Sequence, residues 1–179
     1  YLLYAFMIAL PPLAWLFRGS SSNADVMGKS LFLFPGAALC KAQEVEVFSG
    51  EERASIFWRV ENNTPVQVQE SIGLASGNIT TIGAVPESSQ PIFAGTTQEL
   101  TLGLDRLKSL FWDGNRGVLS GMLDGSSSST QAFFYVPASM TLESAKMNST
   151  KARAEVNGQW VSLPLPASGG AFELSFTRK

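Results

Sequence analysis

Histidine is absent from the 179-residue chain, and cysteine occurs once, at Cys40. Without an imidazole there is no Ser-His-Asp or Cys-His catalysis, no histidine-ligated metal and no imidazole proton relay. A lone cysteine has no partner within the chain, which excludes a disulfide-stapled extracellular module. These shortages favour attachment and assembly over catalysis, and we predict that the protein is not an enzyme.

Charge is scarce as well. Thirteen lysine and arginine residues stand against fifteen aspartate and glutamate residues, and the formal net charge is −2. A nucleic-acid surface needs a basic stripe, so nucleic acid is not a predicted partner. Glu51 and Glu52 lie in the turn-like segment SGEER, where we expect solvated charges rather than a catalytic carboxylate pair.

Long apolar runs are also few, and the longest opens the chain. Residues 1–17, YLLYAFMIALPPLAWLF, carry no charge and are followed by Arg18. A helix that crosses the hydrocarbon core of a bilayer needs at least about 17 apolar residues. Because the sequence begins at Tyr1 rather than at methionine, we expect the segment to have been longer upstream. We predict a transmembrane helix over residues 1–18, with a signal-peptide core and a buried soluble helix as the alternatives.

A Pro-Pro pair interrupts this run. Pro11 and Pro12 remove two backbone donors, so a helix kinks here unless its surroundings satisfy the freed carbonyl groups. The pair therefore favours packing against an integral membrane protein complex, with membrane lipid around the rest of the helix. The expected contact residues in this segment are Tyr4, Phe6, Pro11, Pro12 and Trp15.

The side of the membrane stays open. Arg18 and Lys29 follow the apolar run, and the positive-inside tendency would place the next domain in the cytoplasm. Sequons at Asn62, Asn78 and Asn148 would accept glycans in a eukaryotic secretory lumen. Chance is a sufficient explanation for them in a chain rich in serine and threonine.

Beyond the run, residues 19–43 are expected to form a neck and a first apolar segment, and residues 44–179 one β-sandwich domain. Apolar and polar residues alternate there in short runs separated by Gly, Pro, Asn and Ser, which is typical of half-buried strands. The surest element is a hairpin over 152–163, because Asn157-Gly158 suits a type I′ turn. Helical spacing predicts a short helix over 104–111. Strands are expected over 44–48, 55–60, 66–74, 79–85, 98–102, 117–123, 131–136, 152–156, 159–163 and 172–177.

Several motifs imitate ligand sites. Asp113-Gly114-Asn115 and Asp124-Gly125-Ser126 look like pieces of calcium loops but lack the closing acidic ligand, so we interpret them as turns. Methionines are possible copper ligands, although scattered methionines more often fill gaps in a core. We predict neither a metal nor a cofactor. The methionines concerned are Met27, Met122, Met140 and Met147.

Large rings occupy adjacent positions at Phe57-Trp58, Phe111-Trp112 and 133–135, FFY. Neighbouring side chains of a strand point to opposite faces, so each group is expected to place one ring outside the core. Exposed rings mark contact surfaces. The residues expected to contact a partner from this domain are Trp58, Trp112 and Tyr135. The alternative is that both faces are buried between sheets and the short helix.

Residues 54–137 resemble the periplasmic copper-chaperone family called PCuAC. The resemblance rests on 55–62, SIFWRVEN, followed by Thr64-Pro65-Val66, and on 92–100, IFAGTTQEL, which is similar to that family's I-x-A-G-x-x-x-E-L stretch. It implies an immunoglobulin-like sandwich. That family binds copper through histidine and methionine, and the segment after Leu100 has neither. The resemblance therefore implies an accessory subunit of a respiratory assembly rather than copper delivery.

A second resemblance lies in the apolar run. Leu3-Tyr4-Ala5-Phe6-x-Ile8, followed by Leu16-Phe17-Arg18, is similar to the single membrane helix of the H subunit of purple bacterial photosynthetic reaction centres. This resemblance implies a photosynthetic complex as the partner.

Together these observations predict a mainly β protein, an immunoglobulin-like antiparallel β-sandwich with one N-terminal transmembrane helix. The expected role is that of a non-catalytic, single-pass accessory subunit of a photosynthetic or respiratory membrane complex. The alternative is a membrane-tethered carrier or chaperone for a metal or a small ligand.

Overall fold

The computed structural model describes residues 29–33, 43–46, 55–68, 71–74, 80–97, 102–126 and 130–179. The predicted membrane helix over 1–18, with Tyr4, Phe6, Pro11, Pro12 and Trp15, lies outside these ranges. Among the residues described, no helix has the length and apolar character needed to span a bilayer.

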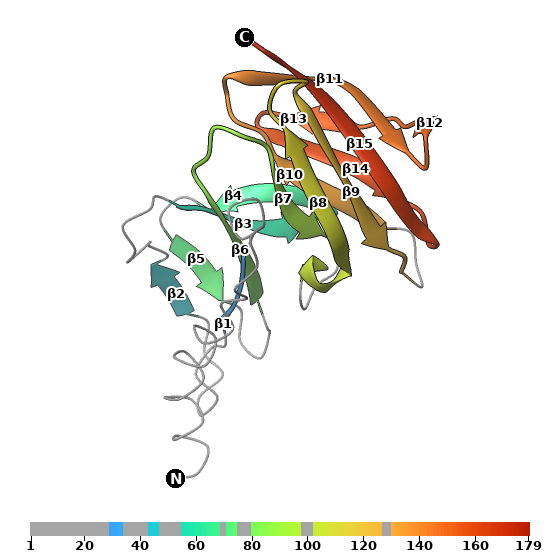
Figure 1. The fold of residues 1–179 in the computed structure, drawn as a ribbon. Coiled ribbons are helices and arrows are strands. Elements are labelled where there is room, and N and C mark those ends of the chain that lie inside the picture. Colours follow the sequence, from blue (N-terminus) through green and yellow to red (C-terminus); the bar gives the residue numbers. More distant parts are fainter. Residues whose placement is uncertain are drawn as a thin grey trace.

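Almost every described element is a strand, which confirms the mainly β prediction (Figure 1). One turn of 3₁₀ helix, η1 at Leu104–Arg106, interrupts the series. The strands are β1 Lys29–Leu33, β2 Gln43–Glu46, β3 Ser55–Glu61, β4 Thr64–Val68, β5 Ser71–Leu74, β6 Thr80–Pro86, β7 Ile92–Thr96, β8 Leu107–Asp113, β9 Val118–Asp124, β10 Thr130–Tyr135, β11 Met140–Met147, β12 Thr150–Lys151, β13 Glu155–Asn157, β14 Trp160–Leu165 and β15 Gly169–Arg178.

The strands form three antiparallel sheets and a two-stranded ribbon. We call β1-β6-β3-β4 the N-terminal sheet, β13-β14-β10-β7 the middle sheet and β12-β11-β15-β9-β8 the outer sheet; β2 and β5 form the ribbon. In the outer sheet the long strand β15 runs between β9 and β11 (Figure 1).

The middle sheet is buried on both faces. On β10, Ala132 and Phe134 belong to a main core that it shares with the outer sheet, whereas Phe133 and Tyr135 belong to a second cluster. That second cluster, the aromatic core, also holds Trp58 of the N-terminal sheet. Because successive side chains of a strand point to opposite faces, β10 packs against one sheet on each side.

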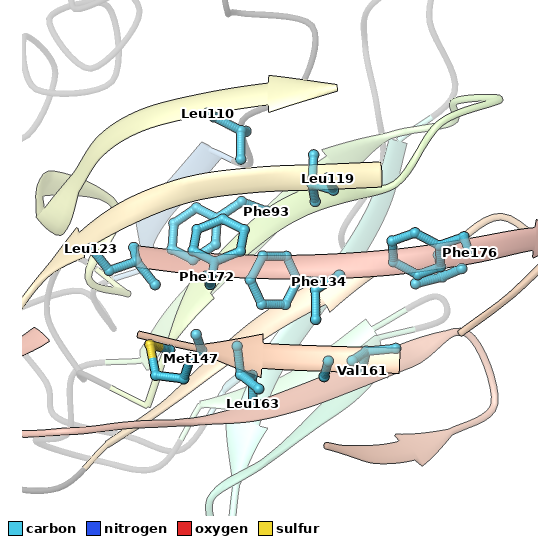
Figure 2. Packing of buried hydrophobic residues seen from close by; sticks show 14 of the residues in the cluster. Phe93, Leu110, Leu119, Leu123, Phe134, Met147, Val161, Leu163, Phe172 and Phe176 are labelled. Atoms are coloured by element: carbon cyan, nitrogen blue, oxygen red, sulfur yellow. The ribbon is translucent and has the colours of Figure 1, made fainter. Parts of the chain in front are cut away.

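The main core closes a sandwich of the middle and outer sheets, which confirms the predicted sandwich architecture. Figure 2 shows Phe93 and Phe134 of the middle sheet packed with Leu119 and Phe172 of the outer sheet. The Phe134 ring lies 5.1 Å from that of Phe172 and 5.5 Å from that of Phe93, separations at which aromatic pairs attract each other.

The strand order differs from that of an immunoglobulin constant domain. In that order, ABED and CFG, the last strand lies at the edge of its sheet. Here the last strand, β15, pairs with β9 on one side and with β11 on the other. The sandwich architecture of the prediction holds, and the order of the strands does not follow that class.

The helix predicted over 104–111 is wrong. Only η1 is helical, and residues 107–113 form β8. The apolar residues there fit both periods over so short a run, and burial decides between them. Leu110 is buried and Trp112 packs against the main core, while Ser109 before them and Phe111 between them are exposed. A strand satisfies this alternation and a helix does not.

Other boundaries also differ from the expectation. β11 was not expected, and the strand expected over 66–74 is split between β4 and β5. In the strand expected over 98–102, only Leu102 is described; it lies outside any strand, with φ of 51°. The backbone there turns to lead into η1.

The hairpin expected over 152–163 forms, with Val156 opposite Val161 and Asn157 opposite Trp160. Its turn lies one residue further along than predicted, at Gly158-Gln159. Only Gly158 has a positive φ, 59°, which fits a type II′ turn rather than type I′. Paired positive φ values, typical of type I′, occur instead at Asn62-Asn63 and at Asn148-Ser149.

Candidate docking surface

The outer sheet has one face on the main core and one face toward solvent. On β8, Leu110 points into the core, and Phe111, its neighbour, keeps 65% of its surface exposed. A single exposed apolar residue is common on a monomer surface, whereas apolar residues that adjoin one another can mark a contact site.

The apolar neighbour of Phe111 is Met122, which is 49% exposed on β9. Phe111 lies opposite Ser120, and Met122 lies opposite Ser109, so the two large side chains are diagonal neighbours on the same face. We call Phe111 and Met122 the apolar patch.

Small residues also lie on this face. Ala171 lies opposite Met122, and Ser175 of β15 lies opposite Ser144 of β11. We call this solvent-facing side of the outer sheet the docking face.

Two salt bridges lie on the docking face. Lys108 Nζ lies 2.7 Å from Asp124 Oδ2, and Lys146 Nζ lies 2.8 Å from Glu173 Oε1 across β11 and β15. The hydrogen bond from Lys146 and its positive charge lower the pKa of the Glu173 carboxyl below its usual range. These pairs compensate four charges of the face, and the exposed Lys151 of β12, which lies opposite Lys146, adds one positive charge.

The turn between β8 and β9 fixes the ends of both strands. Asp113 Oδ1 accepts hydrogen bonds of 3.1 Å from the backbone N–H groups of Asn115 and Arg116. The carbonyl of Gly117 accepts a 2.7 Å bond from the N–H of Phe176 in β15. The prediction of a turn at Asp113-Gly114-Asn115 is confirmed, and the Asp113 carboxylate serves the turn itself.

Two of the expected partner-contact rings do not point outward. Trp58 has no exposed surface, and its ring lies 5.8 Å from that of Phe133 and 5.3 Å from that of Trp160. Tyr135 keeps only 6% of its surface exposed, and its ring also packs against Trp160 at 5.3 Å. Both lie in the aromatic core because the middle sheet is covered on each side.

Tyr135 carries the clearest electrostatic signature of that core. Burial raises the pKa of its phenol above the usual value, and the nearby carboxylate of Glu87 adds to the effect. A hydrogen bond with the Gln159 side chain opposes them. The neutral phenol is therefore the form that the fold prefers.

Trp112 is half-buried, with its ring 6.2 Å from that of Phe176 at the margin of the main core. Its neighbour Phe111 is the outward ring of the pair. Phe111 and Met122 are thus the surface residues that the sequence argument missed. If residues 107–113 are assigned as a strand with Leu110 in the core, alternation places Phe111 on the outer face.

Met27 lies outside the described residues, and the three described methionines do not form a ligand set. Met140 and Met147 are buried in the main core, whereas Met122 lies on the opposite face of the outer sheet. Within the described part of the chain, no three His, Cys, Asp or Glu side chains gather where they could hold a metal ion.

No protein-family model matches the chain, and no curated protein is similar to it.

Proposed function

We propose that this chain is a non-catalytic, single-pass accessory subunit of a larger membrane bioenergetic complex, photosynthetic or respiratory. Residues 1–18 anchor it and dock through the Pro11-Pro12 kink, and the docking face covers an exposed surface of the same complex. The observation that carries the proposal is the apolar patch, Phe111 and Met122, on a sheet face that also carries two salt bridges.

The size of the docking face fits a tethered contact. Strands about 4.8 Å apart and roughly seven residues long give a five-stranded sheet a footprint of about 550 Å². A stable interface between free partners buries about 800 Å² on each side. An anchor in the same membrane compensates for the smaller face, because it raises the effective concentration of the partner without any further contact.

The described part of the chain contains a sandwich of two packed antiparallel sheets, and its strand order differs from that of the immunoglobulin class. In this proposal the domain keeps the sandwich architecture of the PCuAC family and has lost its copper ligands. The separation of Met122 from the buried Met140 and Met147 speaks against the alternative of a tethered copper carrier.

The test is purification of the tagged full chain from its own membranes in mild detergent, with co-migrating proteins identified by mass spectrometry. We expect an integral membrane complex in constant ratio to the chain, and less of it with Phe111→Ser plus Met122→Ser. The matched control is Val156→Ser, because Val156 is 59% exposed on β13, away from the docking face. A wild-type chain that migrates alone would overturn the proposal.

A further inference from the structure

The outer sheet ends in an edge strand, β8. Edge strands are usually protected from pairing by short length, proline or a covering segment. Several other described edges have such protection: β12 has two residues, β13 has three, and β4 carries Pro65. The end of β7 is covered where the N–H of Thr96 donates to the carbonyl of Leu102, and β1, an edge with five residues, is shorter than β8. β8 has seven residues without proline, and among the described strands only β9 pairs with it. An exposed edge of this length is a template for another strand.

The two halves of β8 differ. A bulge between Leu107 and Ser109 disturbs the first half, and bulges discourage pairing at an edge. Lys108 lies at that bulge and is drawn to Asp124 of β9, so its charge does not reach across the open edge. From Ser109 to Asp113 the register with β9 is regular. This second half is the segment open to a partner.

We propose that residues 109–113 of β8 pair antiparallel with the same residues of a second copy of this chain, with Phe111 opposite Phe111 at a two-fold axis. The pairing rests on the proposed function, because one strand pair is a small contact and the membrane anchor supplies the local concentration that it needs. It adds to that function a second copy of the chain, which lies beside the β8 edge of the docking face.

The side chains select this register. A two-fold axis perpendicular to the sheet keeps each face on its own side, so paired residues must point the same way. With Phe111 on the axis, the two rings meet on the docking face, Leu110 meets Trp112 on the core side, and Ser109 meets Asp113. Aromatic cross-strand pairs of this kind stabilise antiparallel sheets.

The neighbouring register fits less well. With Leu110 on the axis, Lys108 would lie opposite Trp112 and Leu107 opposite Asp113, which sets charges against apolar side chains. The formal net charge of −2 opposes the approach of two copies only weakly.

Pairing would also enlarge the docking face. Edge-to-edge contact continues the sheet and leaves its faces open, so two five-stranded faces would become one of about 1,100 Å². The two apolar patches would lie together at its centre. Such a face exceeds the roughly 800 Å² per side of a standard interface.

Cysteine cross-linking of the full chain in its membranes tests the register. In a Cys40→Ser background, Phe111→Cys and Ser109→Cys are oxidised with copper phenanthroline, and dimers are counted on non-reducing gels. Directly opposite residues in an antiparallel pair have Cα atoms about 4.5–5.5 Å apart, which suits a disulfide. We expect most of the Phe111→Cys chain to become dimer, at least tenfold more than Ser109→Cys alone. The double variant Ser109→Cys/Asp113→Cys should also cross-link.

Absence of the Phe111→Cys dimer would overturn the pairing, and so would equal cross-linking at Phe111→Cys and Ser109→Cys. Flotation of the same samples with membrane vesicles reports the anchor separately. A chain that floats but does not cross-link retains the proposed function and loses the pairing. A chain that cross-links at Phe111→Cys without floating keeps the pairing and loses the membrane anchor.

Discussion

The indole of Trp58 lies directly over Gly83, its cross-strand partner in β6. A Cβ atom added to Gly83 would stand 2.2 Å from Trp58 Nε1. The ring has nowhere to retreat, because Phe133 and Trp160 of the middle sheet pack against it. The Trp58 ring fits between the N-terminal and middle sheets because Gly83 has no side chain.

Gly83→Ala is therefore expected to destabilise the fold by about 1–3 kcal/mol, the usual cost of overpacking a core. Denaturant unfolding followed by tryptophan fluorescence measures the free energy of unfolding. Gly114→Ala is the matched control: its new methyl group would lie 3.3 Å from the indole of Trp112 on an exposed turn. Equal stability of the two variants would show that Trp58 is not wedged against Gly83.

Two hairpin turns of the same type provide a second pair. Asn62 and Asn148 each begin a turn with two positive φ values. The side-chain amide of Asn148 also forms hydrogen bonds with the backbone of β15. Its Oδ1 accepts a 3.0 Å bond from the N–H of Ala171, and its Nδ2 donates to the carbonyl of Gly169 at 3.3 Å.

Glycine tolerates positive φ, so Asn62→Gly should change the free energy of unfolding by less than about 0.5 kcal/mol. Asn148→Gly should cost about 1–3 kcal/mol, because it also deletes two hydrogen bonds. Thermal and denaturant unfolding of both variants check this. If the two substitutions cost the same, the Asn148 side chain does not hold the start of β15.

The phenol of Tyr135 predicts an alkaline limit to stability. Burial and Glu87 raise its pKa in the folded chain, whereas the unfolded chain loses this proton near pH 10. Stability from this group is complete below the unfolded pKa and declines as the pH rises above it. Tyr135→Phe should flatten the decline between about pH 9 and pH 11. An unchanged slope in that variant would exclude Tyr135 as its source.

The strand assignment of β8 makes its own prediction at two adjacent residues. Leu110 is 7% exposed in the main core, and Phe111 is 65% exposed on the docking face. Leu110→Ala should destabilise by about 2–4 kcal/mol, and Phe111→Ala should stay within about 0.5 kcal/mol. Comparable losses at both positions, measured in urea, would contradict the two-faced strand.

Local sequence rules predicted the elements in which neighbouring residues decide the outcome. Alternation located β3, β9, β10 and β15, and Asn157-Gly158 located the β13–β14 hairpin. The turn moved by one residue because a single glycine in the first central position suffices for a type II′ turn. The residues between 104 and 111 satisfied both periods, and only contact with the main core favours a strand.

The candidate surface was predictable only in part. One ring was expected outside the core in each group of adjacent rings, and only Phe111-Trp112 has an exposed ring: Phe57 is half-buried, and residues 133–135 are all buried. Which ring of a pair is buried depends on the sheet that covers each face of the strand. That sheet is formed by residues far along the chain. Trp58 is enclosed because β10 and β14 bring Phe133 and Trp160 over it, which no local pattern in β3 reveals.

If the docking face lies against another membrane protein, photo-cross-linking from that face will capture this neighbour. With p-benzoylphenylalanine in place of Met122, irradiation of intact membranes should join the full chain to one integral membrane protein of the complex. The same probe in place of Val156 should give no such adduct. An adduct from position 156 alone, or none with another protein from position 122, would contradict the account.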